Sequence, residues 1–245
     1  CTIPFRIDLA GGWLDFPFVS QLHPGAVLTI SLEPTHPFNN RSGMASSTRN
    51  KAIELWRTSL PQGNKEQVAK ILFSYENPPG TKEVAGSQDS IGIVYPGLNK
   101  LDYNGGYWPY AIESVHDEDV LSWLERRLQL VPLEPRAREF SVLAETRITA
   151  DGARALADAA EDCWRAIRAM DISAFGRAFT ASFDAQVAMF PNMVNRDIHD
   201  LIDAHRSLAR GWKLSGAGGG GYVILVAEQA VPGAMLHDVK VERKA

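Results

Sequence analysis

Four short segments of this chain of 245 residues combine glycines with charged or hydroxyl side chains in patterns that could do chemistry. The most unusual is KLSGAGGGG (213–221), because glycine loses more backbone entropy on folding than any other residue. It contains G-x-G-x-x-G, the fingerprint of dinucleotide-binding folds, but that fingerprint follows a strand and opens a helix. Here the run leads directly into the apolar stretch YVILVA (222–227), so we reject the dinucleotide interpretation. A loop at a phosphate site and a glycine-rich hairpin packed against a neighbouring segment both stay open.

The segment NRSGMASSTRNKAIELW (40–56) could bind phosphate, because it places small residues directly before a predicted helix. The first turn of a helix offers unpaired N–H groups and the positive end of the helix dipole, which together bind anions. Ser46 and Ser47 could equally act only as helix caps, since serine is common at that position.

The other two segments carry carboxylates. Arg6 and Asp8 project from the polar face of a predicted strand, and a glycine pair and Asp15 follow. Asp89 lies within GSQDSIG (86–92), between small residues at the start of another predicted strand. Each pattern alone is typical of solvated charges or of a turn.

Mixed strands and helices must position these segments. Alternating or continuous apolar residues predict strands, and apolar residues at spacings of three and four predict helices. The expected strands are 4–12, 26–33, 91–98, 107–115 and 222–227, and the expected helices are 46–60, 66–76, 118–130, 149–170, 171–190 and 195–211. They follow no βαβ rhythm, so the pattern predicts an α+β fold in two lobes.

The composition excludes several classes of protein. A net charge of −4 argues against a general nucleic-acid binder, which needs a basic face. No run approaches the roughly eighteen apolar residues of a membrane span. The two cysteines, Cys1 and Cys163, make neither a disulfide framework nor a zinc site. We expect a cytoplasmic protein with no nucleic-acid or membrane partner, and the oligomeric state is not readable from these features.

Together and in this order, the four segments resemble the motifs of the GHMP kinase superfamily, named for galactokinase, homoserine kinase, mevalonate kinase and phosphomevalonate kinase. PFRIDLAGGWLD (4–15) resembles the P-x-R-x-x-x-x-G-G-x-x-D of the fucokinase and heptose-kinase branch, and SGMASST (42–48) resembles G-L-G-S-S-A. GSQD (86–89) is similar to that branch's G-K-Q-D, and KLSGAGGGG matches the third motif almost letter for letter. The match extends from position 4 to 225, nearly the whole chain.

The resemblance implies the two-lobed GHMP kinase fold. An ATP-binding lobe similar to a ribosomal-protein domain would cover residues 1–118, and a ferredoxin-like lobe would cover residues 119–245. It also implies ATP-dependent transfer of a phosphoryl group to a hydroxyl of a sugar, the anomeric one in this branch, with Mg²⁺ as cofactor.

The resemblance further implies a role for each matching residue. Asp89 would accept the proton of the attacking hydroxyl, and Arg6 would keep Asp89 ionised and stabilise negative charge on the nucleophile. Ser47, with Ser46 as the alternative, and Glu76 would bind Mg²⁺, which prefers oxygen ligands. The implied phosphate-binding residues are Gly43, Met44, Ala45, Ser46, Ser47, Gly216 and Gly219. The implied substrate-binding residues are Asp8, Gly12, Trp13, Asp15 and Gly218; Asp8 could instead be only a structural partner of Arg6.

Several positions depart from the family pattern. Met44 and Ala45 replace a leucine and a glycine of the second motif, and Ser87 stands where lysine is common. Trp13 stands in place of a third glycine and Ser90 in place of glutamine, both beside the expected sugar pocket. A kinase of a cyclitol or another polyol therefore stays an alternative, as does a non-catalytic sugar-binding regulator with the same fold.

The spacing between the first two motifs is also short. Between Asp15 and Ser42 the chain has one clear strand and then PTHPFNN, where the family places further strands and its adenine-binding loop. Either the adenine pocket is unconventional or residues are missing from the sequence. We expect the second, between about residues 33 and 41.

Overall fold

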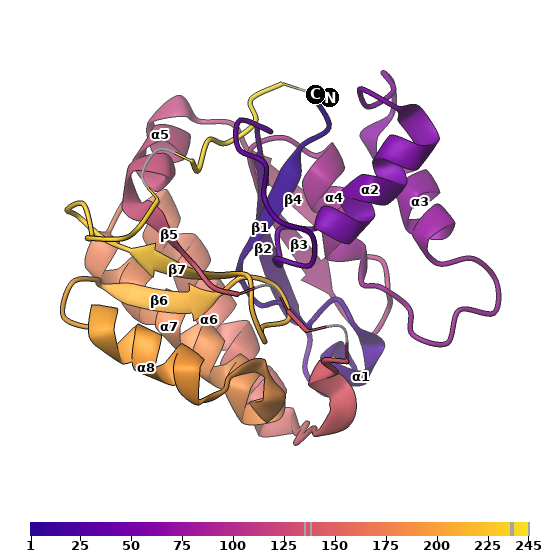
Figure 1. Ribbon diagram of the computed structural model, residues 1–245. Coiled ribbons are helices and arrows are strands. Elements are labelled where there is room, and N and C mark those ends of the chain that lie inside the picture. The colour runs from indigo at the N-terminus through magenta and orange to yellow at the C-terminus, as the bar shows by residue number, and fades with distance from the viewer. Residues whose placement is uncertain (135, 138, 236–237, 245) are drawn as a thin grey trace.

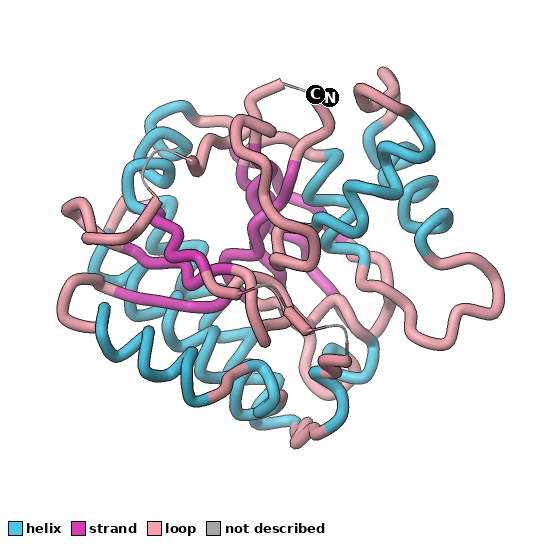
Figure 2. The backbone as a smooth tube through the Cα atoms, viewed as in Figure 1, coloured by secondary structure: helices cyan, strands magenta, loops and turns pink. Residues whose placement is uncertain are grey.

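The computed structural model describes residues 1–134, 136–137, 139–235 and 238–244. Two antiparallel sheets and a set of helices make up this part of the chain (Figures 1 and 2). The strands are β1 (Phe5–Ala10), β2 (Gly25–Leu32), β3 (Leu98–Tyr103), β4 (Ala111–Val115), β5 (Leu128–Pro132), β6 (Gly211–Leu214) and β7 (Tyr222–Val226). The α-helices are α1 (Pro17–Ser20), α2 (Ser46–Trp56), α3 (Lys65–Glu76), α4 (Ser87–Val94), α5 (Glu118–Arg127), α6 (Ala150–Arg168), α7 (Ile172–Met189) and α8 (Arg196–His205). Short 3₁₀ helices span Val142–Ala144 and Pro191–Met193.

The first sheet has the order β1-β2-β3-β4, and every residue of β1 is buried. Phe5, Ile7 and Leu9 pack into an apolar cluster with residues of α6 and α7. Arg6 and Asp8 point to the opposite face, because side chains alternate along a strand. The alternation in the sequence therefore predicts correctly which side chains of β1 leave the core.

The second sheet has the order β5-β7-β6, with the wholly buried β7 in its centre. Helices α6 and α7 pack against each other, and α7 also packs against β1 of the first sheet and β6 of the second. Thr149 and Asp171 cap the two helices with side-chain hydrogen bonds to Gly152 N and Ala174 N. The predicted α+β class is confirmed, and within the described residues no helix is long and apolar enough to cross a bilayer.

The predicted strand at 91–98 is wrong, because residues 87–94 form helix α4. A short apolar run such as Ile91–Val94 has no period that separates a strand from a buried helix. Helix α4 instead begins after Gly86 and ends before Pro96, a position that disfavours helical geometry in the preceding residue. Strands β5 and β6 were not expected either, since both are short and directly follow helical segments.

The loop of residues 33–45 runs from β2 to α2 without a helix or strand. Phe38 anchors it by edge contacts with the rings of Phe5 and Tyr222, at centroid distances of 5.0 and 5.6 Å. We expect residues to be missing from the sequence within this loop, and this stays a prediction. The coding sequence of the gene would test it. The expected lobe boundary at residues 118 and 119 also stays a prediction.

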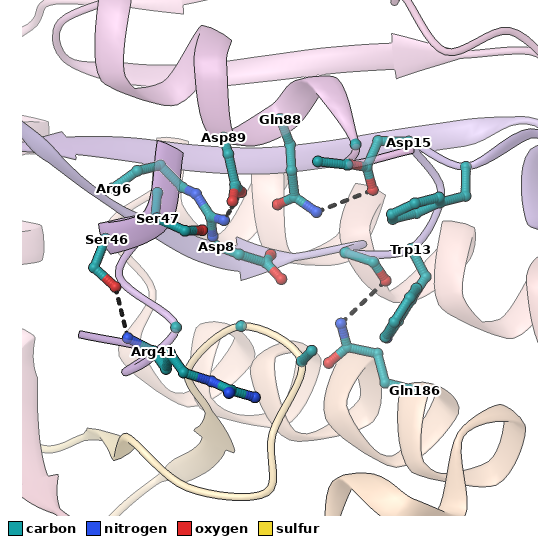
Figure 3. Close-up of a pocket in the computed structure, with 18 of the residues that line it drawn as sticks. Arg6, Asp8, Trp13, Asp15, Arg41, Ser46, Ser47, Gln88, Asp89 and Gln186 are labelled. Atoms are coloured by element: carbon teal, nitrogen blue, oxygen red, sulfur yellow. Dashed lines mark hydrogen bonds and ion pairs between the residues drawn. The ribbon is translucent and has the colours of Figure 1, made fainter. Parts of the chain in front are cut away.

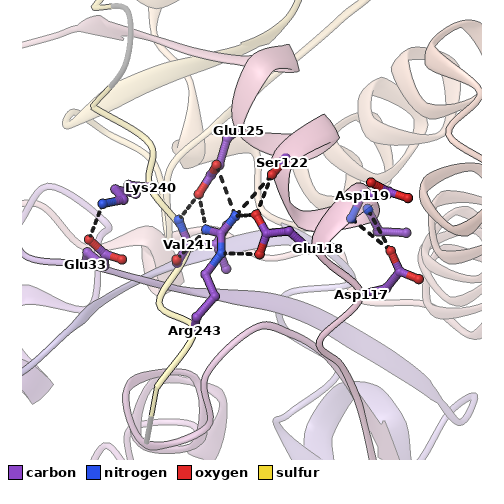
Figure 4. A network of polar contacts seen from close by, with 10 residues as sticks. Glu33, Asp117, Glu118, Asp119, Ser122, Glu125, Lys240, Val241 and Arg243 are labelled. Carbon is purple, nitrogen blue, oxygen red and sulfur yellow. Dashed lines mark hydrogen bonds and ion pairs between the residues drawn. The ribbon is translucent and has the colours of Figure 1, made fainter.

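The C-terminal segment of residues 238–244 packs along the end of the first sheet. Val241 forms a bridge with Leu32, and Arg243 makes ion pairs with Glu118 and Glu125 of helix α5 (Figure 4). These contacts attach the end of the chain to both the first sheet and the helix that leads into the second.

Candidate active site

One cavity of about 580 Å³ brings together residues from all four motif segments (Figure 3). In the view of Figure 3, Arg41 and Ser46 lie at one end, Trp13, Asp15 and Gln186 lie at the other, and Arg6 and Asp89 lie between. The lining residues are Arg6, Asp8, Gly12, Trp13, Asp15, Phe16, Arg41, Gly43, Ala45, Ser46, Ser47, Glu83, Ala85, Gly86, Gln88, Asp89, Arg136, Gln186, Gly216 and Ala217.

An ion pair between Arg6 and Asp89 lies in the middle of the cavity wall. Asp89 is in the first turn of α4, where the helix dipole favours a negative charge. Gly92, one turn further, lets Arg6 pass beneath the helix, because a Cβ there would lie 2.2 Å from Arg6 Cγ. Burial lowers the pKa of Arg6. Its Nε and Nη1 have no hydrogen-bond partner in the described residues, so Asp89 is its one strong contact there.

Thr48 connects Asp89 to Glu76 behind the cavity wall. Its hydroxyl oxygen lies 2.8 and 2.9 Å from the two carboxylate oxygens of Glu76 and 3.4 Å from Asp89 Oδ2. Burial raises the pKa of Glu76, while the hydrogen bond from Thr48 opposes that rise. Two carboxylates thus approach one buried hydroxyl, a set of oxygen donors that suits a hard divalent cation.

Four buried oxygen acceptors at the far end of the cavity lack a partner among the described residues: Asp8 Oδ1, Asp15 Oδ2, Gln88 Oε1 and Gln186 Oε1. Their neighbouring atoms are fixed. Gln88 Nε2 donates to Asp15 Oδ1 at 2.9 Å, and Gln186 Nε2 donates to the carbonyl oxygen of Gly12 at 3.0 Å. Buried acceptors are nearly always paired in native structures, so this end of the cavity suits a ligand that brings several O–H or N–H donors.

Asp15 and Trp13 shape the same end. Burial raises the pKa of Asp15 to about 6, although the nearby charge of Arg6 opposes the rise. Gly86 has to be glycine, because a Cβ there would lie 1.7 Å from Asp15 Oδ2. Trp13 adopts a φ of 90°, which a glycine would adopt without strain, and its ring stacks on Phe190 at a centroid distance of 4.1 Å.

The opposite end is formed by the turn of residues 41–47. Gly43 and Ala45 have φ angles of 78° and 55°, and Ser46 Oγ accepts a hydrogen bond from the backbone N–H of Arg41 at 2.9 Å. Ser46 therefore closes the turn and does not cap helix α2, whose N-cap residue Ala45 makes no side-chain bond. Gly216 packs on this turn so closely that a Cβ there would lie 2.6 Å from Gly43 Cα.

A buried ion pair supports Asp8 from the second sheet. Lys213 Nζ of β6 donates to the backbone oxygen of Asp8 at 2.7 Å and lies 3.3 Å from its Oδ2. Both side chains are almost completely buried, and burial lowers the pKa of Lys213 while Asp8 opposes that change.

The structure thus brings most residues of the sequence-based site to one cavity and leaves others outside it. Arg6 and Asp89 do form a pair, and Asp8 pairs with Lys213. Four expected site residues do not line the cavity: Met44, Glu76, Gly218 and Gly219. The side chain of Met44 is in the core, Glu76 lies behind Thr48, and Gly218 and Gly219 pack against Met193 and Phe140.

Sequence reasoning also missed several residues at or next to the cavity: Arg41, Thr48, Gly86, Gln88, Arg136, Gln186 and Lys213. Gln186 could have been found, because it is a polar residue in line with Phe179 and Phe183 on the buried side of α7. Arg136 has no such signal, since it lies in a loop and reaches the cavity only through contacts made by the folded chain.

No family model matches the sequence, and no curated protein matches it. Solved structures do match the fold. Lactococcus lactis galactokinase complexed with galactose has 14% sequence identity and a TM-score of 0.63, over 93% of this chain and 85% of that one. L. major mevalonate kinase in complex with R-mevalonate has 14% identity and a TM-score of 0.63, over 94% and 88%. A D-glycero-D-manno-heptose 1-phosphate kinase from Bacteriodes thetaiotaomicron has 14% identity and a TM-score of 0.56, over 92% and 87%. The chain therefore has the GHMP kinase fold that its four motifs predict.

Proposed function

We propose that this protein is an ATP-dependent kinase that transfers the γ-phosphate to a hydroxyl of a sugar. The observation that carries the proposal is the Arg6–Asp89 ion pair, which lies between the turn of residues 41–47 and the four unpaired oxygen acceptors of one cavity. The solved kinases with this fold support it, and one of them holds galactose. Transfer to the anomeric hydroxyl rests on the resemblance of the first and GSQD motifs to the fucokinase and heptose-kinase branch.

The end of the cavity that holds the four unpaired oxygen atoms, here called the acceptor end, favours a neutral polyol. Asp8 and Asp15 bring carboxylates to this end, and Gln88 and Gln186 bring amide oxygens, so its unpaired groups are all acceptors. Sugar hydroxyls donate to such groups, whereas an anionic acceptor molecule would be repelled by the two carboxylates. Trp13 supplies an apolar wall beside them.

Asp89 accepts the proton that the acceptor hydroxyl loses as it attacks the γ-phosphate. Arg6 holds the Asp89 carboxylate in place and brings a fixed positive charge to the attacking oxygen. The turn of residues 41–47 offers backbone N–H groups at the start of α2 to the phosphates of ATP. Phosphoryl transfer needs mainly this positioning and charge stabilisation from a protein.

Mg²⁺ fits the oxygen donors behind the turn. Ser47 lines the cavity, and the neighbouring Thr48 brings Glu76 and Asp89 together around one hydroxyl. Ser47 and Glu76 would hold the ion, with water completing its coordination. Bound Mg²⁺ neutralises charge on the phosphates of ATP.

An ADP-release assay across neutral sugars and cyclitols, with R-mevalonate as an anionic comparison, tests the function. We expect turnover with one or more neutral sugars and none with R-mevalonate. Turnover with a cyclitol alone would indicate a polyol kinase, and sugar binding without any turnover would indicate a regulator.

The variant Asp89→Asn tests the assignment of the base. We expect turnover to fall by about 10²–10⁴-fold, because a positioned general base contributes that much, with ATP affinity close to wild type. Asp197→Asn is the matched control, since Asp197 is also in the first turn of a helix but is exposed. Full activity of Asp89→Asn would show that another group accepts the proton.

A further inference from the structure

We propose that Arg136, together with Arg41 at the start of the turn of residues 41–47, forms a second phosphate-binding element at that end of the cavity. The proposal rests on the kinase function above, and it names the side chains of the phosphate end that carry positive charge. The ligand chemistry is a phosphate group, either of the nucleotide or on the acceptor molecule.

The turn itself brings no positive side chain from Ser42 to Thr48, so its donors are backbone N–H groups and hydroxyls. Arg6 lines the cavity but is already paired with Asp89. Among the described lining residues, Arg41 and Arg136 also carry positive side chains. Phosphoryl-transfer sites need positive charge close to the phosphate oxygens, and Arg136 can supply it from the side of the glycine run.

Arg136 is held by one side of its guanidinium group. Its Nε donates to the carbonyl oxygen of Gly218 at 2.8 Å, and its Cζ lies 5.4 Å from the ring centre of Phe140. Neither Nη1 nor Nη2 has a hydrogen-bond partner within the described chain. A guanidinium fixed in this way presents a planar pair of donors, which matches the oxygens of a phosphate group.

The glycine run explains how Arg136 reaches the cavity. A Cβ at Gly219 would lie 2.5 Å from the ring of Phe140, and a Cβ at Gly220 would lie 2.7 Å from the backbone nitrogen of Arg136. Only glycine allows the segment around Arg136 to approach so closely. Gly216 of the same run contacts Gly43 of the turn. The glycine run therefore contacts both the turn and Arg136.

Arg41 is the first residue of the turn. Figure 3 shows its side chain extending away from Ser46, across the cavity from Arg6 and Asp89. Burial lowers the pKa of Arg136, and the positive charge of Arg41 lowers it further. The two guanidinium groups therefore repel each other electrostatically. Two positive groups that converge on one cavity repel until an anion lies between them.

Calorimetric titration with one ligand at a time tests the proposal. Arg136→Gln and Arg136→Lys are compared with wild type and with Arg196→Gln, whose arginine is largely exposed on α8 and outside the cavity. For Arg136→Gln we expect roughly ten- to hundredfold weaker binding of ATP and pyrophosphate and less than about twofold change for AMP, because charged hydrogen bonds to phosphate are lost. Arg136→Lys should recover part of the loss, since it keeps the charge without the planar fork.

The outcomes distinguish the two sources of phosphate. Unchanged nucleotide binding with at least about tenfold weaker binding of a hexose 6-phosphate would place the phosphate on the acceptor. Unchanged binding of every probe, or an equal loss in Arg196→Gln, would overturn the proposal. The protein could turn over no sugar and still bind pyrophosphate in a way that depends on Arg136. That result would contradict the proposed function and support the phosphate-binding role of Arg136.

Discussion

At the scale of single residues, unpaired polar atoms at the acceptor end of the cavity lower the free energy of unfolding. A buried group without a hydrogen bond costs about 1–3 kcal/mol, and four such oxygens meet here. Asp15 carries the largest part, because it is fully buried and burial raises its pKa to about 6. A site that binds a polyol gains affinity by satisfying these oxygens, at the expense of stability when it is empty.

Asp15→Asn should therefore change the pH dependence of stability. The pKa of Asp15 is about 6 in the folded state against an ordinary 3.8, so the folded chain holds this proton more tightly. That contribution to stability is fully present below about pH 4 and is lost as the pH rises through about 6. Between about pH 5 and pH 8 we expect wild type to lose roughly 1–2 kcal/mol more than Asp15→Asn in urea denaturation.

The acceptor affinity should move in the opposite direction. As the pH rises through about 6, Asp15 gains its charge and accepts better, so KM for the sugar should fall in wild type. Asp200→Asn, at an exposed position of α8, is the control for both measurements. Stability curves of wild type and Asp15→Asn that run parallel across this range would contradict the assignment.

At the scale of elements, the sequence predicts a helix or strand correctly where its apolar residues show a clear period. Strand β1 and helices α6 and α7 follow from alternation and apolar spacing, and the motif segments point to Arg6, Asp15 and Asp89. Helix α4 does not, because its apolar run is too short to show a period. Lys213 belongs to the third motif, but the sequence predicts no role for it, since only the fold brings it to Asp8.

The glycine run shows the same limit. The family resemblance implies that Gly216 and Gly219 both lie at the phosphate-binding turn. In the structure Gly216 contacts Gly43, whereas Gly219 contacts Phe140. Substitution of the two glycines should therefore disturb different segments.

Gly216→Ala tests the contact with the turn. Gly216 has a φ of 57°, and the added Cβ would lie 2.6 Å from Gly43 Cα, so the turn has to move. We expect at least about tenfold weaker ATP binding, comparable to the loss of one charged hydrogen bond. Gly80→Ala is the matched control, because Gly80 also has a positive φ, 92°, and its Cβ would meet nothing within 4 Å. Equal ATP affinity in the two variants would show that the contact does not shape the turn.

At the scale of the whole molecule, the two sheets depend on each other for the site. The second sheet supplies Gly216 to the turn through the run that precedes β7, and it supplies Lys213 to Asp8 through β6. Helix α7, which packs between the sheets, supplies Gln186 to the oxygen of Gly12. Asp8 and Gly12 are therefore each fixed by a contact that crosses from one part of the fold to the other.

Lys213→Met should show this dependence in both stability and kinetics. Removal of one partner of a buried ion pair leaves an uncompensated charge, so we expect a loss of about 3–5 kcal/mol in the free energy of unfolding. The double variant Lys213→Met with Asp8→Asn should lose less than Lys213→Met alone, because no buried charge is left behind. Lys240→Met, which breaks a surface pair with Glu33, should lose far less stability than Lys213→Met, because water screens a surface pair.

The kinetic effect of Lys213→Met separates positioning from general destabilisation. Lys213 fixes Asp8 Oδ2, and Asp8 lines the cavity with an Oδ1 that has no partner among the described residues, so loss of Lys213 should raise KM for the sugar more than KM for ATP. Measurements well below the unfolding temperature keep the folded fraction near one for each variant. Equal rises in both KM values, or a double variant less stable than Lys213→Met, would mean that the pair does not hold the acceptor end in place.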